Sequence, residues 1–206
     1  MTFKRLAGAV LCVLALGVAA QAQDKGAAGV KKEPVMDEKQ KAAMEAWQKA
    51  STPGPQHKQL AEMAGTWEVT IKSFEGGGEP QVSTGKASRK MIMGGRYLKE
   101  DYKGTYMGQP FDGMGLTGFD NALKKFTTVW IDSMSTGVGV GSGEMDSTGK
   151  ILTTSMTYSD PMTGKATTMR QILKRESKDL ETFEIYGPGP DGREVKMMEM
   201  TYKRVK

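Results

Sequence analysis

The stretch that decides the fold lies in the middle of the chain, at residues 113–136, and reads GMGLTGFDNALKKFTTVWIDSMST. Two strand-like runs flank Asp120-Asn121, a pair suited to a turn because short polar side chains bond their own backbone and tolerate a positive φ. The period of two in the second run places one row of side chains on a single face: Phe126, Thr128, Trp130, Asp132 and Met134. Because an unpaired carboxylate is costly in a dry apolar core, this row predicts a wall that faces an amphipathic cavity.

The same alternation continues from residue 66 to the C-terminus, and no helical stripe of useful length interrupts it. We expect strands at residues 66–74, 81–93, 95–106, 109–119, 124–134, 137–146, 150–159, 165–175, 179–186 and 193–205. Sequential antiparallel strands without crossover helices favour an all-β, up-and-down β-barrel of about ten strands, because closure removes the exposed sheet edges.

Glycines alternate along two of these strands. Gly113, Gly115 and Gly118 match the letters of the dinucleotide fingerprint, but that motif works only where a strand leads into a helix. Here a turn and another strand follow, so nucleotide binding is disfavoured. We expect glycines to ease strand curvature or to leave room on one face of the strand. The second such row consists of Gly137, Gly139, Gly141 and Gly143, which would open space inside a barrel.

The chain divides into three parts. Residues 1–22 have the basic start, short apolar run and Ala20-Gln21-Ala22 site of a secretory signal peptide, so we expect cleavage after Ala22 and a periplasmic or secreted protein. No later run is long and apolar enough to cross a bilayer. Residues 23–54 are expected to form a flexible tether and an N-terminal helix, and residues 55–206 the β-barrel domain.

The N-terminal helix is expected near residues 37–50, opened by the capping-box-like pair Asp37 and Gln40. Its apolar stripe is narrow and consists of Ala43, Met44, Trp47 and Ala50. Such a stripe is typical of a helix packed on the outside of a fold, and a lid over a barrel mouth is the alternative. A second, short helical turn is expected at residues 56–63.

Composition narrows the functional classes. Cys12, the only cysteine, lies in the signal peptide, so the mature chain would have no thiol or disulfide. Removing Lys4 and Arg5 lowers the formal charge from +5 to +3, and the remaining charges are mixed, so no nucleic-acid partner is expected. His57 is the only histidine, and we expect a helix-start or packing residue rather than a pH-active group. With no histidine or cysteine in a strand, we expect no haem, no zinc and no other cofactor.

Methionine is abundant, with 16 residues in the chain. Met91 and Met93 are expected to share one strand face, as are Met198 and Met200. Such thioethers suit a flexible core or an adaptable apolar cavity. Binding of Cu(I), a soft ion, is the alternative that the sequence leaves open.

Two resemblances build on these motifs. A short helix, a Gly-x-Trp at residues 65–67 and a strand meander ending in a basic residue resemble the calycin superfamily of lipocalins and fatty-acid-binding proteins. That resemblance implies that Trp67 packs under Arg204 and closes the barrel. Residues 55–206 more closely resemble the bacterial secreted family called domain of unknown function 1579, which implies a lipocalin-like barrel and export, with no assigned activity. The matching segments are residues 57–67, 118–121, 130–133 and 161–164, together with Arg170.

We expect this barrel to be a monomer that binds a small hydrophobic or amphipathic molecule in its interior. The residues expected to line the cavity are Tyr97, Glu100, Phe119, Trp130, Asp132 and Arg170. Arg170 is the expected partner of Asp132. Such a pair would either orient the polar group of a ligand, as a few placed polar groups do in an otherwise apolar pocket, or be purely structural. One alternative is an enzyme that uses Asp132 or Glu100 as acid or base. Another is a non-catalytic barrel that docks a cell-envelope partner through its exterior and the Trp47 helix.

Overall fold

The computed structural model describes residues 36–74, 79–160 and 163–206. The expected signal peptide and most of the expected tether lie outside the described residues. The chain falls into two units, residues 1–37 and 38–206, and every element below belongs to the second. Among the described residues, no helix has the length and apolar character needed to cross a membrane.

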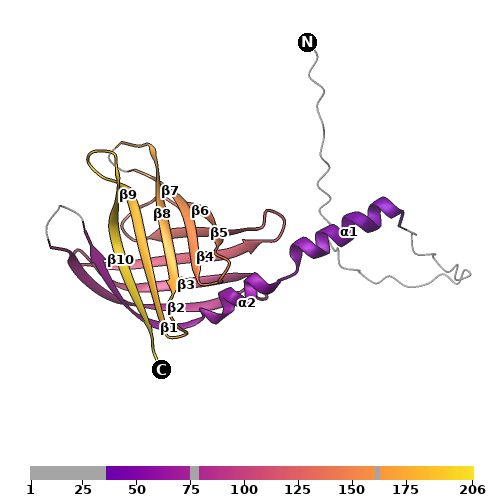
Figure 1. Ribbon diagram of the computed structural model, residues 1–206, viewed down its shortest axis with the longest axis horizontal. Coiled ribbons are helices and arrows are strands. Elements are labelled where there is room, and N and C mark those ends of the chain that lie inside the picture. Colours follow the sequence, from indigo (N-terminus) through magenta and orange to yellow (C-terminus); the bar gives the residue numbers. More distant parts are fainter. Residues whose placement is uncertain (1–35, 75–78, 161–162) are drawn as a thin grey trace, which may run out of the picture. The chain divides into compact units, whose positions relative to one another are not determined.

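The described part of the chain contains ten strands, which close into one antiparallel barrel (Figure 1). Each strand pairs with its neighbours in the chain, and the first pairs with the last. The strands are β1 (Gly65–Ser73), β2 (Gln81–Ile92), β3 (Tyr97–Tyr106), β4 (Gln109–Asp120), β5 (Lys125–Asp132), β6 (Gly139–Met145), β7 (Ile151–Ser159), β8 (Ala166–Arg175), β9 (Leu180–Pro188) and β10 (Glu194–Arg204). The predicted all-β, up-and-down barrel is confirmed.

The turn between β4 and β5 forms at the predicted place. The side-chain Oδ1 of Asp120 accepts hydrogen bonds from the amides of Ala122 (2.8 Å) and Leu123 (2.9 Å). The register then sets Trp130 opposite Gly115 and Asp132 opposite Gly113. The predicted row of β5 starts on the inward face at Phe126, which is 2% exposed in the core. The row ends with the strand, so Met134 is exposed beyond it.

Helix α2 (Pro55–Glu62) closes one end of the barrel, called here the plugged end. Its Leu60 and the following Met63 form an apolar cluster with four strand residues, Leu98, Phe126, Leu152 and Leu173. His57 starts the helix as predicted, because its Nδ1 accepts a hydrogen bond of 2.9 Å from the Gly54 amide. Burial, followed by the nearby Arg96 charge, lowers the pKa of His57.

Helix α1 (Glu38–Ser51) buries none of its residues. Trp47 is 76% exposed and Met44 is 59% exposed, so the prediction that this stripe packs on the fold is wrong. The C-terminus of α1 is held by polar contacts, which satisfy carbonyls that every helix end leaves free. Asn121 donates to the carbonyls of Lys49, Ala50 and Thr52, and Arg96 donates to that of Ser51. These anchors follow β4 and β2 at the plugged end, so α1 is not a lid over the far end.

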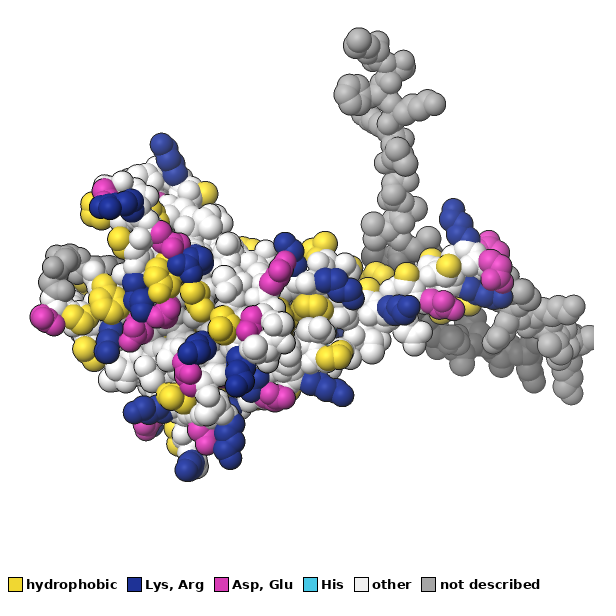
Figure 2. Space-filling model, viewed as in Figure 1, with side chains coloured by type: hydrophobic (Ala, Val, Ile, Leu, Met, Phe, Trp, Pro, Cys, Tyr) yellow, Lys and Arg dark blue, Asp and Glu magenta, His cyan; other side chains and the backbone are white. Residues whose placement is uncertain are grey.

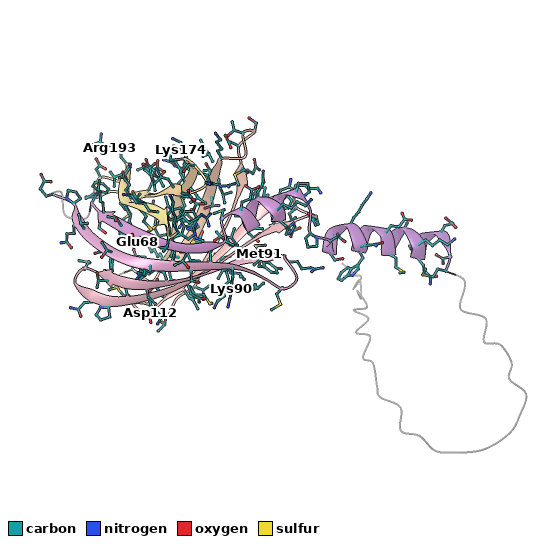
Figure 3. All side chains as sticks on the ribbon, turned by 90° about the horizontal axis from the view of Figure 1, so that it is seen from below. Glu68, Lys90, Met91, Asp112, Lys174 and Arg193 are labelled. Carbon is teal, nitrogen blue, oxygen red and sulfur yellow. The ribbon has the colours of Figure 1, made fainter. Side chains whose placement is uncertain are left out.

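The outer surface of the barrel carries interspersed charges of both signs, as Figure 2 shows for one face. Asp112, on the outer side of β4 (Figure 3), pairs with Lys103 at 3.1 Å. Such exposed pairs contribute little to stability. The charges on the outer surface therefore contribute little to the stability of the fold.

Because α2 is buried and α1 is exposed, shortening a side chain should affect stability strongly in α2 and weakly in α1. Leu60→Ala should lower the free energy of unfolding by about 2–5 kcal/mol, because it empties a fully buried site in the plug. Met44→Ala on α1 should change it by about 0.5 kcal/mol or less, as for other exposed sites. Urea unfolding followed by circular dichroism measures both. Equal shifts of the two midpoints would show that α2 is not part of the core.

Candidate functional site

A buried ion network lies on the inward face of the barrel near the plugged end. Arg89 on β2 donates through Nε to Glu100 on β3 and through Nη1 to Glu181 on β9. The side chains of Arg89, Glu100 and Glu181 are 5%, 14% and 1% exposed. Two carboxylates therefore share one guanidinium inside the barrel.

Aromatic rings enclose the same guanidinium. The Cζ atom of Arg89 lies 4.4 Å from the ring centre of Tyr202 and 5.2 Å from that of Trp67, which are distances of cation–π contacts. Burial lowers the pKa of Arg89, but the charges of Glu100 and Glu181 outweigh it, so the pKa lies above its usual range. Burial and the Glu100 charge also raise the pKa of Tyr202. Arg89 is thus a buried cation that contacts two carboxylates and two aromatic rings.

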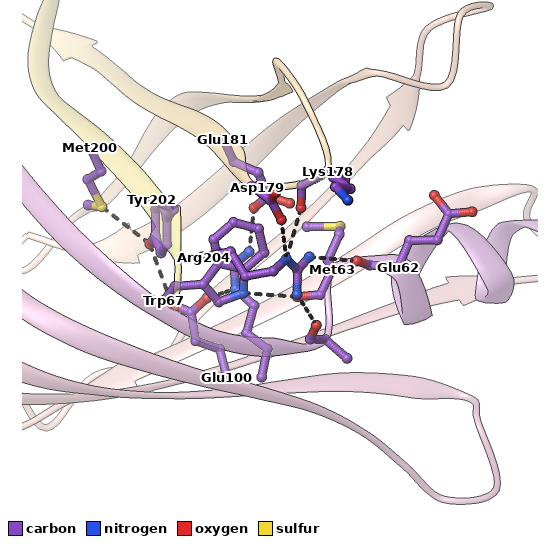
Figure 4. Close-up of polar contacts among 12 residues, drawn as sticks. Glu62, Met63, Trp67, Glu100, Lys178, Asp179, Glu181, Met200, Tyr202 and Arg204 are labelled. Atoms are coloured by element: carbon purple, nitrogen blue, oxygen red, sulfur yellow. Dashed lines mark hydrogen bonds and ion pairs between the residues drawn. The ribbon is translucent and has the colours of Figure 1, made fainter. Parts of the chain in front are cut away.

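Arg204 on β10 lies over Trp67 on β1, with its Cζ 4.1 Å from the ring centre (Figure 4). Trp67 is 0% exposed, and its Nε1 donates to the Met63 carbonyl at 3.1 Å. Arg204 donates in turn to the carbonyls of Glu62 (2.9 Å) and Lys178 (2.8 Å). This is the arrangement that the calycin resemblance implies, and it joins the first strand, the last strand and the end of α2.

Trp130 and Asp132 lie toward the far end of the same interior. The indole lies against Gly113 and Gly115, where an added Cβ would come within 2.3 and 3.3 Å of it. These glycines leave room for a ring, as predicted. Asp132 accepts from Trp130 Nε1 (3.0 Å) and from the Met134 amide (3.0 Å). Its carboxylate therefore has two donors, neither of them the predicted arginine.

Tyr158 on β7 continues this polar region. Its ring lies against Gly139, where an added Cβ would come within 2.3 Å. Gln171 on β8 donates to the Tyr158 hydroxyl at 3.3 Å. Burial raises the pKa of Tyr158 to about 12, and the Asp132 charge adds to the rise against the opposing hydrogen bond from Gln171. The effect of the charge indicates that Asp132 and Tyr158 are close neighbours.

Arg170 lies on the outer face, so its predicted pairing with Asp132 is wrong. On β8 the buried Gln171 and Leu173 face inward, and alternation turns Arg170 outward. There it donates two hydrogen bonds to Glu194, at 3.0 and 2.6 Å. Its Cζ lies 4.2 Å from the ring centre of Tyr186.

Tyr97 and Phe119 also depart from the predicted lining. Tyr97 is 39% exposed and lies against Gly118, on the face opposite that of the buried Leu98. Phe119 packs at the plugged end, with ring centres 5.0 Å from Phe126 and 6.1 Å from His57. Both border a surface hollow of about 300 Å³ beside the junction of the two helices. The expected interior lining is thus reduced to Glu100, Trp130 and Asp132, for which it stays a prediction.

Residues 52–204 match a family model described as protein of unknown function, DUF1579. The chain belongs to this family. Its barrel is similar to that of Rv2717c from M. tuberculosis, with a TM-score of 0.58 and 11% identity over 75% of this chain and 100% of that chain. The S-type phycobiliprotein lyase CPES from Guillardia theta has a TM-score of 0.49 and 10% identity, over 75% and 99% of the two chains. The likeness to Rv2717c shows the fold alone, and no curated protein matches the sequence.

Sequence reasoning missed several interior residues of this DUF1579 barrel: Arg89, Glu181, Tyr158 and Gln171. A signal for Arg89 was present, because it shares the parity of Ala87 and Met91 on β2. The pairing of Arg89 with Glu181 had no local signal, since the two residues are 92 positions apart.

Several methionines lie on the inward face of the barrel, and one of those predicted to do so lies in a turn instead. Met198 and Met200 pack on the inner apolar cluster as predicted, whereas Met93 is 69% exposed in a turn and does not share a face with Met91. Met156 faces Met169 across β7 and β8. Within the described residues, no three His, Cys, Asp or Glu side chains form a metal-binding group. Thioether binding of Cu(I) stays a hypothesis.

Removing the central cation should destabilise this DUF1579 protein strongly. Arg89→Met should cost about 3–5 kcal/mol, because it leaves two buried carboxylates without their partner. Adding Glu100→Gln and Glu181→Gln should restore part of the loss, since residues in one network are coupled. Arg193→Met, which removes an exposed guanidinium, is the control and should leave the urea midpoint nearly unchanged. Additive losses in the triple variant would contradict the network.

The Asp132 charge contributes to the raised pKa of Tyr158, which predicts a coupled titration. In Asp132→Asn the pKa of Tyr158 should fall from about 12, because a negative charge that opposes ionisation is lost. The control, Asp112→Asn on the outer face, should leave it unchanged. The measurement is a pH titration of the Tyr158 Cζ chemical shift in protein with isotope-labelled tyrosine, assigned with Tyr158→Phe. An unchanged value in Asp132→Asn would place the carboxylate away from the interior.

Proposed function

We propose that this barrel binds a small, largely apolar molecule with one polar group in its interior. The supporting observation is that inward side chains away from α2 keep solvent-accessible surface although the sheet is closed. These half-buried side chains are Trp130, Ile185, Met198 and Met200. An inward side chain of a closed barrel remains accessible by lining a space that solvent reaches. Barrels of eight or more strands enclose such ligand spaces.

The chemistry of this wall suits an apolar ligand. Thioethers adapt to ligands of varied shape because their side chains are long, unbranched and polarizable. Trp130 adds a large flat surface, held in place by its hydrogen bond to Asp132. Ligand sites are typically apolar with a few placed polar groups, and Glu100 and Asp132 are such groups here. The interior therefore combines apolar surface with a few polar groups, the two features that an amphipathic ligand needs.

The dense packing at the plugged end also supports the proposal. Trp67, Leu60 and Glu181 are 0–1% exposed there, so the barrel is densely packed beside α2. Accessible inward surface is left on β5, β9 and β10. A site on rigid strands supported by a dense core is pre-organised, which lowers the entropy that binding costs.

A second candidate function is docking of a partner through α1. The observation that favours it is the exposure of Met44 and Trp47, three residues apart on one helix face, which is the spacing of anchors in helix-in-groove recognition. The acid–base alternative gains no such support. Glu100 is held by Arg89, and Asp132 by an indole and an amide.

Export of the protein to the periplasm or beyond is part of the same proposal. It rests on the signal-peptide pattern of residues 1–22. Mass spectrometry of the protein purified from the cell envelope or medium should find Gln23 at the N-terminus. An intact Met1 would contradict it.

Uptake of the neutral dye Nile red tests the binding function. We expect saturable fluorescence enhancement, and in Trp130→Ala a dissociation constant about tenfold higher, since one aromatic contact contributes about 0.5–1.5 kcal/mol. Trp47→Ala on α1 is the control and should bind as the unchanged protein does. Circular dichroism verifies the fold of each variant. Absence of saturable uptake, or an equal loss in Trp47→Ala, would contradict an interior site.

A further inference from the structure

The charges on the inward face of the barrel do not balance. Apart from Arg175 and Arg204, the acidic and basic side chains at inward positions of the described strands are Arg89, Glu100, Glu181 and Asp132. One guanidinium therefore faces three carboxylates. The arginines at the plugged end have acids of their own: Arg175 pairs with Glu62 at 2.8 Å, and Arg204 with Asp179 at 3.5 Å. The interior thus has two formal negative charges in excess.

Arg89 is buried and already paired with two carboxylates. Its Nε and Nη1 atoms are bound to Glu100 and Glu181, and the rings of Tyr202 and Trp67 lie within cation–π distance. A carboxylate or phosphate that entered the barrel would have to displace an internal partner. It would also bring a third negative charge in excess into a space that screens charge less than water does.

Glu100 is open to a donor. Its Oε2 binds Arg89, but the contact from Tyr202 to Oε1 is long, at 3.5 Å. The Glu100 side chain also keeps 14% of its surface. An ionised carboxylate can accept about four hydrogen bonds, so this group has acceptor capacity toward the interior.

A second, independent feature lies two residues along the same face of β3. Tyr102 is 3% exposed, and its hydroxyl has no hydrogen-bond partner among the described residues. Burial, with a contribution from the Glu100 charge, raises its pKa. A buried polar atom without a partner is costly, and native structures rarely keep one without reason. A ligand group that donates a hydrogen bond would satisfy the Tyr102 hydroxyl.

Aromatic rings at inward positions of β4 and β5 also favour a cation. The ring of Phe111 lies 5.7 Å from that of Tyr102, and the indole of Trp130 is hydrogen-bonded to Asp132. Ring faces attract positive charge, and they do so more strongly when water is excluded. Carboxylates beside aromatic faces form an environment for an alkylammonium group.

We propose that the polar group of the ligand is a protonated amine, bound by the carboxylates of Glu100 and Asp132 with the Tyr102 hydroxyl. This inference rests on the proposed function and makes its ligand a cationic amphiphile. The full chain has a formal charge of +5, so its long-range field favours anions. A preference for amines must therefore arise inside the barrel.

Displacement of Nile red by decylamine, decanol and decanoate at pH 7 tests the proposal. The three share one chain length, and at this pH the first is cationic and the last anionic. We expect decylamine to bind about tenfold more tightly than decanol, the equivalent of one good charge contact, and decanoate to bind most weakly. Equal affinities, or decanoate binding best, would overturn the amine proposal while leaving an apolar site intact. Failure of Nile red itself to bind would overturn the site.

Two variants locate the charge preference. Asp132→Asn should weaken decylamine several-fold, strengthen decanoate and leave decanol unchanged. Tyr102→Phe, which removes an unpaired hydroxyl and keeps the ring, should weaken decylamine and also decanol, whose hydroxyl is a donor too. Asp112→Asn, outside the barrel (Figure 3), is the control for net charge and should preserve all three affinities. An equal effect of Asp112→Asn, or unchanged decylamine binding in both interior variants, would contradict the proposed site.

Discussion

Pairing of β1 with β10 closes the sheet, and this closure divides every strand into an enclosed face and an outer face. The constraint determines which side chains can meet. Arg89 reaches Glu181 across 92 positions because both fall on the enclosed face, whereas Arg170 is excluded from it by one position relative to Gln171. A carboxylate inside must therefore find its donors among the enclosed rows, and Asp132 finds them in Trp130 and its own backbone neighbourhood.

The same enclosed face is used in two ways along its length. At the plugged end, α2 contributes Leu60 and Met63, and Arg204 ties Trp67 to the carbonyls at the end of that helix. Farther along, the glycines of β4 and β6 leave room that the rings of Trp130 and Tyr158 occupy in part. Dense packing beside α2 supplies stability, so the rest of the wall can keep accessible apolar surface at a tolerable cost.

The hairpin at Asp120, the position of Trp67 and the glycine rows could be predicted because each depends on local chemistry or on one clear alternation. On β1 the apolar residues Trp67, Val69 and Ile71 share one parity, so its inner face is unambiguous. On β8, by contrast, Met169, Ile172 and Leu173 lie on both parities. The outward position of Arg170 therefore had no sequence signal. Tyr97 is the first residue of β3. At the end of a strand, the sequence does not show which face of the barrel a side chain lies on. The exposure of α1 was unpredictable for another reason. An apolar stripe predicts that a helix has an apolar face, but it does not show whether the barrel covers that face.

The sharing of Arg89 between two carboxylates raises the question of why the interior has more acidic than basic groups. A single ion pair of Arg89 with Glu181 would already satisfy the buried cation, and adding Glu100 brings a further carboxylate into a poorly screened space. Asp132 adds another acid, and the Tyr102 hydroxyl has no partner among the described residues. Each of these features costs folding free energy in an empty barrel. A bound cation would offset all three together, and any ligand that binds the folded chain alone stabilises it by mass action. Unbalanced polar groups in an otherwise well-packed barrel thus have one common physical explanation, a positively charged ligand group.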